Sequence, residues 1–213
     1  MKPNQQVIDL NTKAARVYHD TLPGSPGEDY LRERGLWEGA EQFQLGWVEK
    51  PIPGHEDRFV HTISIPYLTK AGCVGMKFRR IDGSTPKYDQ MPGQKQHIFN
   101  VAAVIDAVSE VLIVEGELDA IASTINGHPA CAIAGANGWR SSWARCFDGI
   151  QRILIVTDND DKEDGSNPGQ ELARRLSDSF PNSIRVSLPL GHDVNSMIET
   201  YGAQAYTDLV QAI

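Results

Sequence analysis

The chain has 213 residues, of which 40% are hydrophobic, so it can form a core in one large domain or two small ones. Its formal net charge of −8 argues against a protein that coats nucleic acid with positive charge over its whole surface. The three cysteines form no Cys-x-x-Cys pair, which excludes a zinc ribbon or finger, and their odd number favours reduced thiols in the cytoplasm. No apolar run approaches membrane-spanning length and the N-terminus has no signal-peptide core, so we expect no membrane partner.

The N-terminal part of the chain is predicted to be helical. Apolar residues between Val7 and Tyr18 approximate one helical face, and the Pro- and Gly-rich run Leu22–Gly27 ends that helix. A second helix is predicted from Pro26 to Arg34, where Gly35 stops it. The stretch Glu41–Val48 is predicted to be a short helix that turns into a strand.

The next segment is predicted to be β and is basic. Strands are expected over Phe59–Tyr67 and Val74–Ile81, with a turn at Lys70–Gly72. Between Phe59 and Lys95 the only acids are Asp82 and Asp89. The basic residues outnumber them and are Lys70, Lys77, Arg79, Arg80, Lys87 and Lys95. A sheet with a solvated charged face explains this pattern, and so does a surface that holds the phosphates of a template or nucleotide.

The stretch from Val111 to Ala120 organises the second half of the chain. Four apolar residues lead into Glu115 and Gly116, and the spacing then changes to that of a helix. Gly116 allows a tight turn between strand and helix. Glu115 is therefore expected at the carboxyl end of a buried strand, where open α/β sheets bind ligands, with Asp119 one helical turn further on.

Two later strands are also expected to end in acids. Ile153–Thr157 precedes Asp158 and Asp160, which alternation places on one side, and the run ending at Leu188 precedes Asp193. A single acid after a strand is usually a solvated residue or a helix cap. Three such strand ends could bring carboxylates to one rim, where their repulsion and oxygen chemistry favour bound Mg²⁺ or Mn²⁺.

The predicted fold class is α+β. Residues 1–105 are expected to form a mixed α/β subdomain with a basic sheet, and residues 106–213 a four-stranded, mainly parallel sheet with flanking and C-terminal helices. The strands are predicted at Val111–Val114, Pro129–Ala134, Arg152–Thr157 and Ser183–Leu188. The helices are predicted at Glu117–Asn126, Trp139–Phe147, Pro168–Phe180 and Val194–Tyr201. The run Gly135–Gly138 could bring N–H groups to a phosphate or be a plain turn.

The acids resemble those of a TOPRIM domain, the fold shared by bacterial-type primases, topoisomerases and some nucleases. That fold has a Glu after its first strand, a second acid four residues on and a later Asp-x-Asp, which here are Glu115, Asp119, Asp158 and Asp160. The resemblance covers roughly Asp106 to Tyr201. It implies a Mg²⁺ or Mn²⁺ site formed by Glu115, Asp119, Asp158, Asp160 and Asp193, with Glu115, Asp158 and Asp160 as catalytic residues.

A longer resemblance, from about Lys13 to Tyr201, is to the catalytic core of bacterial DnaG-type primases. It rests on segments that occur in the family's order: Tyr30–Leu36, Phe43–Trp47, Asp57–Phe59, Ile65–Pro66 and Thr85–Tyr88. It implies that Lys77, Arg79 and Lys87 hold nucleotide or template phosphates. Glu115 is expected to place a metal ion or to accept the 3′-hydroxyl proton.

The function implied is metal-dependent synthesis of short RNA primers on single-stranded DNA. The expected partners are the DNA template, ribonucleoside triphosphates and a separate replicative helicase, in a bacterial host if the chain is encoded by a phage. The chain departs from the family in lacking its zinc-binding and helicase-binding domains, in Asn100-Val101 where the family has His-Lys, and in Asn195 where it usually has Asp. A TOPRIM-type nuclease and a non-catalytic DNA- or replisome-binding module are the alternatives.

Overall fold

The computed structural model describes residues 4–107, 109–134, 138–159 and 167–212, and the chain divides into two compact units, Met1–His97 and Ile98–Ile213. The sequence-based boundary at residue 105 lies after this division, and the segment between the two, residues 98–105, includes one short helix, α3 (Val101–Ile105). Val104 of α3 lies in the core of the second unit, and Phe99 pairs with Ala132 there, so this segment belongs to the second unit.

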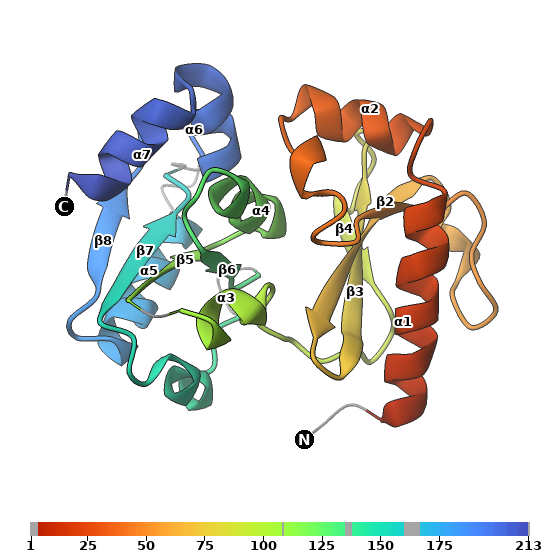
Figure 1. Ribbon diagram of the computed structural model, residues 1–213, viewed down its shortest axis with the longest axis horizontal. Helices are drawn as coiled ribbons and strands as arrows, with labels where there is room; N and C mark the ends of the chain where they lie inside the picture. The colour runs from red at the N-terminus through yellow and green to blue at the C-terminus, as the bar shows by residue number, and fades with distance from the viewer. Residues whose placement is uncertain (1–3, 108, 135–137, 160–166, 213) are drawn as a thin grey trace. The chain divides into compact units, whose positions relative to one another are not determined.

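The first unit is an antiparallel sheet with helices (Figure 1). Its sheet has the order β1-β2-β3-β4, with β1 at Gly46–Trp47, β2 at Thr62–Thr69, β3 at Gly72–Arg80 and β4 at Tyr88–Gln90. Its helices are α1 (Gln5–Asp20) and α2 (Pro26–Glu33), with 3-10 turns η1 (Trp37–Gly39) and η2 (Asp57–Phe59). The Ser25 hydroxyl caps α2 by accepting the Gly27 and Glu28 N–H groups, and Pro26 opens that helix, as the sequence predicts.

Helix α1 covers one face of this sheet. Ala14 and Ala15 are fully buried, and their small side chains let the helix approach β3 closely. From β3, Met76 and Phe78 are fully buried in the same core, where the rings of Phe78 and Phe59 stack. Because successive side chains of a strand alternate between its faces, residues 77 and 79 lie on the face away from α1.

The second unit contains a four-stranded parallel sheet flanked by helices, which confirms the predicted α+β class (Figure 1). The strand order is β6-β5-β7-β8, with β5 at Glu110–Val114, β6 at Ala130–Ala132, β7 at Arg152–Thr157 and β8 at Ile184–Ser187. The remaining elements are α4 (Glu117–Ile125), η3 (Ser141–Phe147), α5 (Pro168–Ser179), α6 (Val194–Tyr201) and α7 (Ala203–Gln211). Each predicted strand and helix of this unit has a counterpart in the structure.

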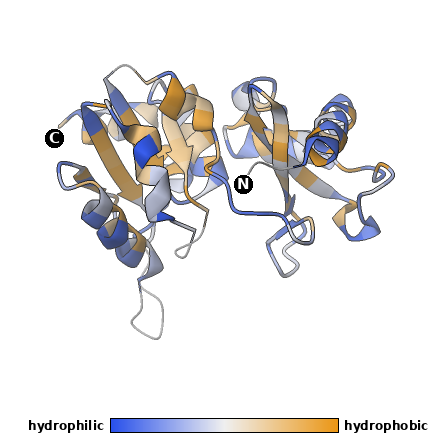
Figure 2. Ribbon diagram, turned by 90° about the horizontal axis from the view of Figure 1, so that it is seen from below, coloured by the Kyte–Doolittle hydropathy of each residue, from blue (hydrophilic) through white to orange (hydrophobic). Residues whose placement is uncertain are grey.

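The parallel strands are buried on both faces, which explains their uninterrupted apolar sequences. All four residues Val111–Val114 are fully buried, and Figure 2 shows hydrophobic colour along the strands of this unit. Ile113 and Ile155 belong to a core that includes Leu172 and Leu176 of α5. This packing fixes the positions at which the strands end.

One predicted α-helix has a different form. The segment predicted as a helix over Trp139–Phe147 is the 3-10 helix η3, which begins at Ser141. Arg140, the residue before it, is extended and provides no side-chain cap, and the Trp143 N–H donates to the Arg140 carbonyl three residues back. Trp139 packs in the core and donates from Nε1 to the Ser179 hydroxyl, as expected for a packing residue. Among the residues that the structure describes, no helix has the length and apolar content needed to cross a membrane.

Candidate active site

The turn after β5 places Glu115 at the carboxyl end of the parallel sheet. Glu115 directly follows Val114, the last residue of β5, and Gly116 is the N-cap of α4. A Cβ atom at Gly116 would lie 2.3 Å from Oδ2 of Asp119, so only glycine lets the carboxylate of Asp119 fold back onto this turn. The sequence analysis predicted the turn, but not this reason for glycine, since Gly116 has extended backbone angles that any residue adopts.

Asp119 has a structural contact that its spacing did not reveal. Its side chain is only 6% exposed, and Oδ1 accepts the backbone N–H of Asn195 at 3.0 Å. One turn further along α4, the hydroxyl of Ser123 bonds that of Tyr206 on α7 at 2.7 Å. Burial raises the pKa of the Tyr206 hydroxyl above its ordinary value, so it remains protonated. Helix α4, which follows Glu115, is thereby joined to both α6 and α7.

Asp158 follows the neighbouring strand. Strands β5 and β7 are adjacent and parallel, with Val114 opposite Val156, so Glu115 and Asp158 leave the same edge of the sheet. A Cβ atom at Gly169 would lie 2.2 Å from the Asp158 carbonyl oxygen, so glycine allows the start of α5 to touch the backbone here. Asp160, the other member of the predicted pair, and the run 135–137 lie outside the described residues.

The loop after β8 joins the same edge. The Asn159 N–H donates to the His192 carbonyl at 3.2 Å, and the Gly191 N–H donates back to the Asn159 carbonyl at 2.9 Å. The Asn159 side-chain amide also donates to the Leu188 carbonyl at 2.7 Å. The sequence analysis did not identify Asn159, whose position between two acids was the only signal available. Its bonds hold the ends of β7 and β8 together.

Asp193 is the N-cap of α6. Its Oδ1 accepts the Ser196 N–H at 2.6 Å, and the Ser196 hydroxyl accepts the Asp193 N–H at 3.0 Å, which forms a capping box. Together with Asp119, it supplies carboxylate oxygens to two successive backbone N–H groups of α6. Both acids therefore stabilise the start of this helix, independently of any ligand.

Acids follow three neighbouring strands at one edge of the parallel sheet. Glu115, Asp158 and Asp193 follow β5, β7 and β8, which are neighbours in the strand order. Within the described ranges, no group of three or more His, Cys, Asp or Glu side chains is close enough to hold a metal ion. The carboxylate oxygens present are of the type that Mg²⁺ and Mn²⁺ prefer.

The cations predicted to contact phosphates lie in the sheet of the first unit. Lys77 and Arg79 share one face of β3, and Arg79 lies opposite Tyr88 of β4. Lys87 is exposed, Lys77 is half-buried, and Arg79 is only 6% exposed. The three residues therefore differ in how readily a phosphate can reach them.

Two tyrosines hold Arg79. Its Nε donates to the Tyr30 hydroxyl at 2.8 Å and Nη1 donates to the Tyr88 hydroxyl, while both aromatic rings lie near the guanidinium group. Burial by itself lowers the pKa of Arg79, but Tyr88 and Tyr30 outweigh it and the net shift is upward. The Lys77 ammonium lies 5.5 Å from the centre of the Tyr88 ring. This face of the sheet thus combines cations with tyrosine rings.

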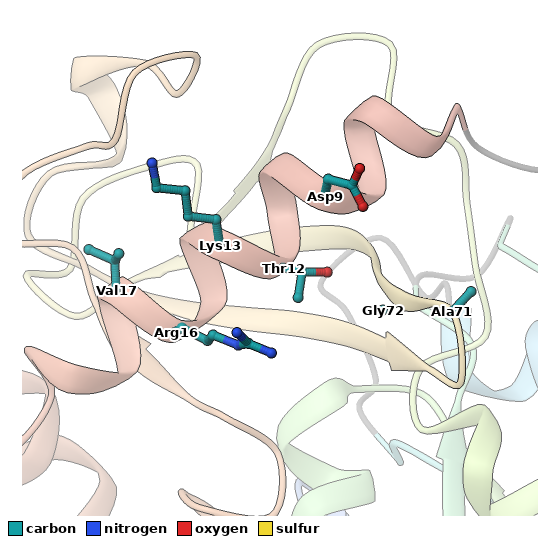
Figure 3. A pocket seen from close by; sticks show the side chains of 7 residues that line it. All are labelled: Asp9, Thr12, Lys13, Arg16, Val17, Ala71 and Gly72. Carbon is teal, nitrogen blue, oxygen red and sulfur yellow. The ribbon is translucent and has the colours of Figure 1, made fainter.

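A further basic surface lies on α1, and the sequence analysis missed it. Lys13 and Arg16 are exposed and line a pocket of about 420 Å³ together with the turn between β2 and β3 (Figure 3). The Thr12 hydroxyl ties helix to turn by accepting the Cys73 N–H at 2.9 Å. Asp9, the one acid of the pocket, already accepts a hydrogen bond from Gln5. The signal for this surface was two cations three residues apart on a predicted helix.

The sequence comparisons find one curated relative of note and no matching protein-family model. The relative is the Gene 57 protein of Mycobacterium phage D29, which is 30% identical over 153 residues. The alignment covers 70% of this chain and 97% of the relative.

The fold is similar to solved primase catalytic cores. The zinc-binding and RNA polymerase domains of the Aquifex aeolicus primase match with a TM-score of 0.75 and 18% identity over 99% of this chain, which spans 62% of that chain. A DNA primase domain from Pseudomonas aeruginosa matches with a TM-score of 0.74, 22% identity, and coverage of 96% of this chain and 78% of that one. A third match is the RNA polymerase domain of Mycobacterium tuberculosis primase DnaG, solved in complex with a double-stranded DNA oligomer with a 6-nucleotide overhang. It has a TM-score of 0.74 and 20% identity, and the match covers 99% of this chain and 81% of that one. At these identities the similarity establishes a shared fold.

Proposed function

The chain belongs to the family of the Gene 57 protein of Mycobacterium phage D29, and we propose that it is a DnaG-type primase core that synthesises short RNA primers on single-stranded DNA. The observation that carries the proposal is the edge of the parallel sheet, where Glu115, Asp158 and Asp193 follow three neighbouring strands. The chain shares its fold with primase catalytic cores, and one such neighbour was solved bound to single-stranded DNA. Fold and acid placement thus point to the same chemistry.

In this proposal the second unit, Ile98–Ile213, forms a TOPRIM catalytic domain and the first unit, Met1–His97, provides the basic sheet for template and nucleotide. The Glu-Gly turn after β5 and the Asp after β7 are the elements that support the TOPRIM assignment. The exposed Lys87 and half-buried Lys77 supply cations for phosphates. Arg79 is held between tyrosines and acts mainly by fixing Tyr88 and the β4 backbone beside it.

The acids suit a hard divalent cation. Glu115, Asp158 and Asp160 would hold Mg²⁺ or Mn²⁺, and Asp119 and Asp193 complete the acid set while also bonding α6. When bound, the cation supplies neutralisation of triphosphate charge. Glu115 follows directly from the rigid β5 and is the residue we assign to accept the 3′-hydroxyl proton of the growing primer. The expected partners are ribonucleoside triphosphates, a DNA template and a separate replicative helicase in a bacterial host cytoplasm.

A non-catalytic DNA- or replisome-binding module is the second candidate. The observation that favours it is that the described residues contain no group of three close acids or histidines for a metal ion. In that case the basic sheet and the α1 surface would bind nucleic acid, and the acids would serve only the fold.

One assay separates these functions. The full chain is incubated with single-stranded DNA, four ribonucleotides and Mg²⁺ or Mn²⁺, and the products are sized on a gel. Short RNA supports the primase, shortened DNA indicates a TOPRIM-type nuclease, and retained DNA without product indicates the binding module. Glu115→Gln should abolish short RNA, whereas Asp148→Asn, a change of an exposed acid in the same unit, should leave it unchanged.

A further inference from the structure

A second cavity of the first unit lies away from the basic sheet face and the α1 basic surface. It has a volume of about 360 Å³ and lies between α1 and residues 91–97, with β3 contributing Val74. Five of its lining residues are apolar: Val7, Leu10, Val74, Met91 and Pro92. Val7 is 46% exposed, so its side chain forms an accessible part of the cavity wall. The volume is within the range of ligand-binding pockets.

One polar side chain lines this apolar cavity without a partner. Asn11 is only 3% exposed, yet no described residue forms a hydrogen bond with its side-chain amide. The Asn11 amide atoms are not among the buried side-chain atoms that lack a hydrogen-bond partner, so they face the space of the cavity, where water or a ligand can pair with them. The amide offers a donor and an acceptor side by side, which is the pattern that a peptide group complements. A peptide group that enters the cavity can therefore bond with the Asn11 amide.

The charges around the cavity indicate the rest of the ligand. Lys95 and His97 line it, and no carboxylate does so among the described residues, although the chain as a whole carries a net charge of −8. Nucleotide pockets commonly stack the base on aromatic rings, but the only aromatic ring among the described lining residues is the His97 imidazole. Met91 adds an adaptable wall of the kind found at peptide-binding surfaces.

We propose that this cavity binds a short peptide segment of a partner protein, with an apolar side chain in the Val7–Met91 space, a backbone amide on Asn11 and an acidic residue beside Lys95. The proposal concerns protein recognition and does not depend on primer synthesis. An aliphatic anchor and a carboxylate together match the apolar wall and the basic rim better than either a nucleotide or a basic peptide would.

The test uses a displayed library of random heptapeptides, selected on the full wild-type chain and separately on Lys95→Glu. Lys95 is exposed, so the charge reversal should leave the fold intact. We expect wild type to enrich peptides with an aliphatic residue next to Asp or Glu, and Lys95→Glu to lose them or to enrich Lys and Arg instead. A synthetic peptide from the wild-type pool should bind Asn11→Leu at least about fivefold more weakly.

Location and ligand class are checked on the ¹⁵N-labelled chain. The enriched peptide should shift the amide signals of Val7, Asn11 and Val74, and AMP should not shift them at the same concentration. The proposal is overturned if no peptides are enriched, if the wild-type pool is basic, or if its peptides bind wild type and Lys95→Glu equally. Saturable shifts of these signals by AMP alone would instead identify a nucleotide pocket and would also overturn it. Circular dichroism of Asn11→Leu confirms its fold, and the Lys95→Glu comparison decides the outcome if that variant does not fold.

Discussion

Replacing Asp119 by alanine separates a role in the fold from a role in metal binding. The carboxylate is 6% exposed and accepts the Asn195 N–H at 3.0 Å. A hydrogen bond to a charged group contributes about 1.5–3 kcal/mol, and the negative charge near the start of α6 adds about 0.3–1 kcal/mol. Because these two contributions overlap, we expect Asp119→Ala to lower the free energy of unfolding by about 2–3 kcal/mol. Asp119→Asn keeps an acceptor and should lose about half as much, since it lacks only the charge.

The assay is urea unfolding in EDTA, followed by circular dichroism and by hydrogen exchange of the α6 amides. Without metal, a residue that acts only as a ligand would not stabilise the fold, and its removal would even relieve repulsion among neighbouring acids. The matched control is Asp208→Ala on α7, an exposed acid whose carboxylate accepts a hydrogen bond from the Gln204 amide, and it should leave α6 exchange unchanged. If Asp119→Ala is as stable as wild type in EDTA, with unchanged exchange of α6, the structural role assigned to Asp119 is wrong.

Three further outcomes are expected. Asp158→Asn should weaken Mn²⁺ binding, measured by calorimetry, and should recover its primer yield at high Mn²⁺. Glu115→Gln should lose about 10²–10⁴-fold in the rate of primer synthesis, and high Mn²⁺ should not restore it. Equal rescue of both variants would make Glu115 a metal ligand. Lys87→Ala should lower the slope of log affinity for single-stranded DNA against log salt concentration by about 0.7. Arg79→Ala should mainly lower the melting temperature of the first unit. An unchanged slope for Lys87→Ala would mean that the basic face of the sheet is only a solvated charged face. Burial lowers the pKa of His55 in the folded chain, so the stability that neutral His55 contributes is present above the unfolded pKa of about 6.5 and is lost as the pH falls below that value. His55→Gln should therefore lose less free energy of unfolding than wild type between pH 7 and pH 5 in urea titrations. An equal loss in the two proteins would contradict the prediction.

The local sequence pattern was enough to predict a helix or strand where the residues of that element determine its own ends. Strand β7 and helix α6 have the predicted bounds, because an apolar run and a capping Asp each mark an end. The α5 helix follows from Pro168 at its first turn and the apolar spacing of Leu172 and Leu176. The 3-10 form of η3 was not predicted in this way, because the spacing of apolar residues over seven positions does not distinguish a 3-10 helix from an α-helix.

The site required contacts that no local pattern contains. The sequence placed Glu115 and Asp158 after strands, but the adjacency of β5 and β7 is a property of strand order. Arg79 matched a family position for phosphate contact, yet its burial depends on Tyr30, which lies 49 residues earlier. Residue type and spacing thus indicated the chemistry available, and tertiary packing decided which side chains remain accessible.

Asp119 and Asp193 show why acids in this kind of site are difficult to assign from spacing alone. Both were predicted as metal ligands, and both accept backbone N–H groups at the start of α6, from Asn195 and Ser196. Two carboxylates there compensate the positive end of a helix dipole, which supplies a reason for acids without any metal ion. Because α6 leads from β8 and Asp119 follows the Glu115 turn, these bonds also set where the ends of β5 and β8 lie. The same two acids can therefore position this edge of the sheet and contribute charge to it, and only stability measured without metal distinguishes the two contributions.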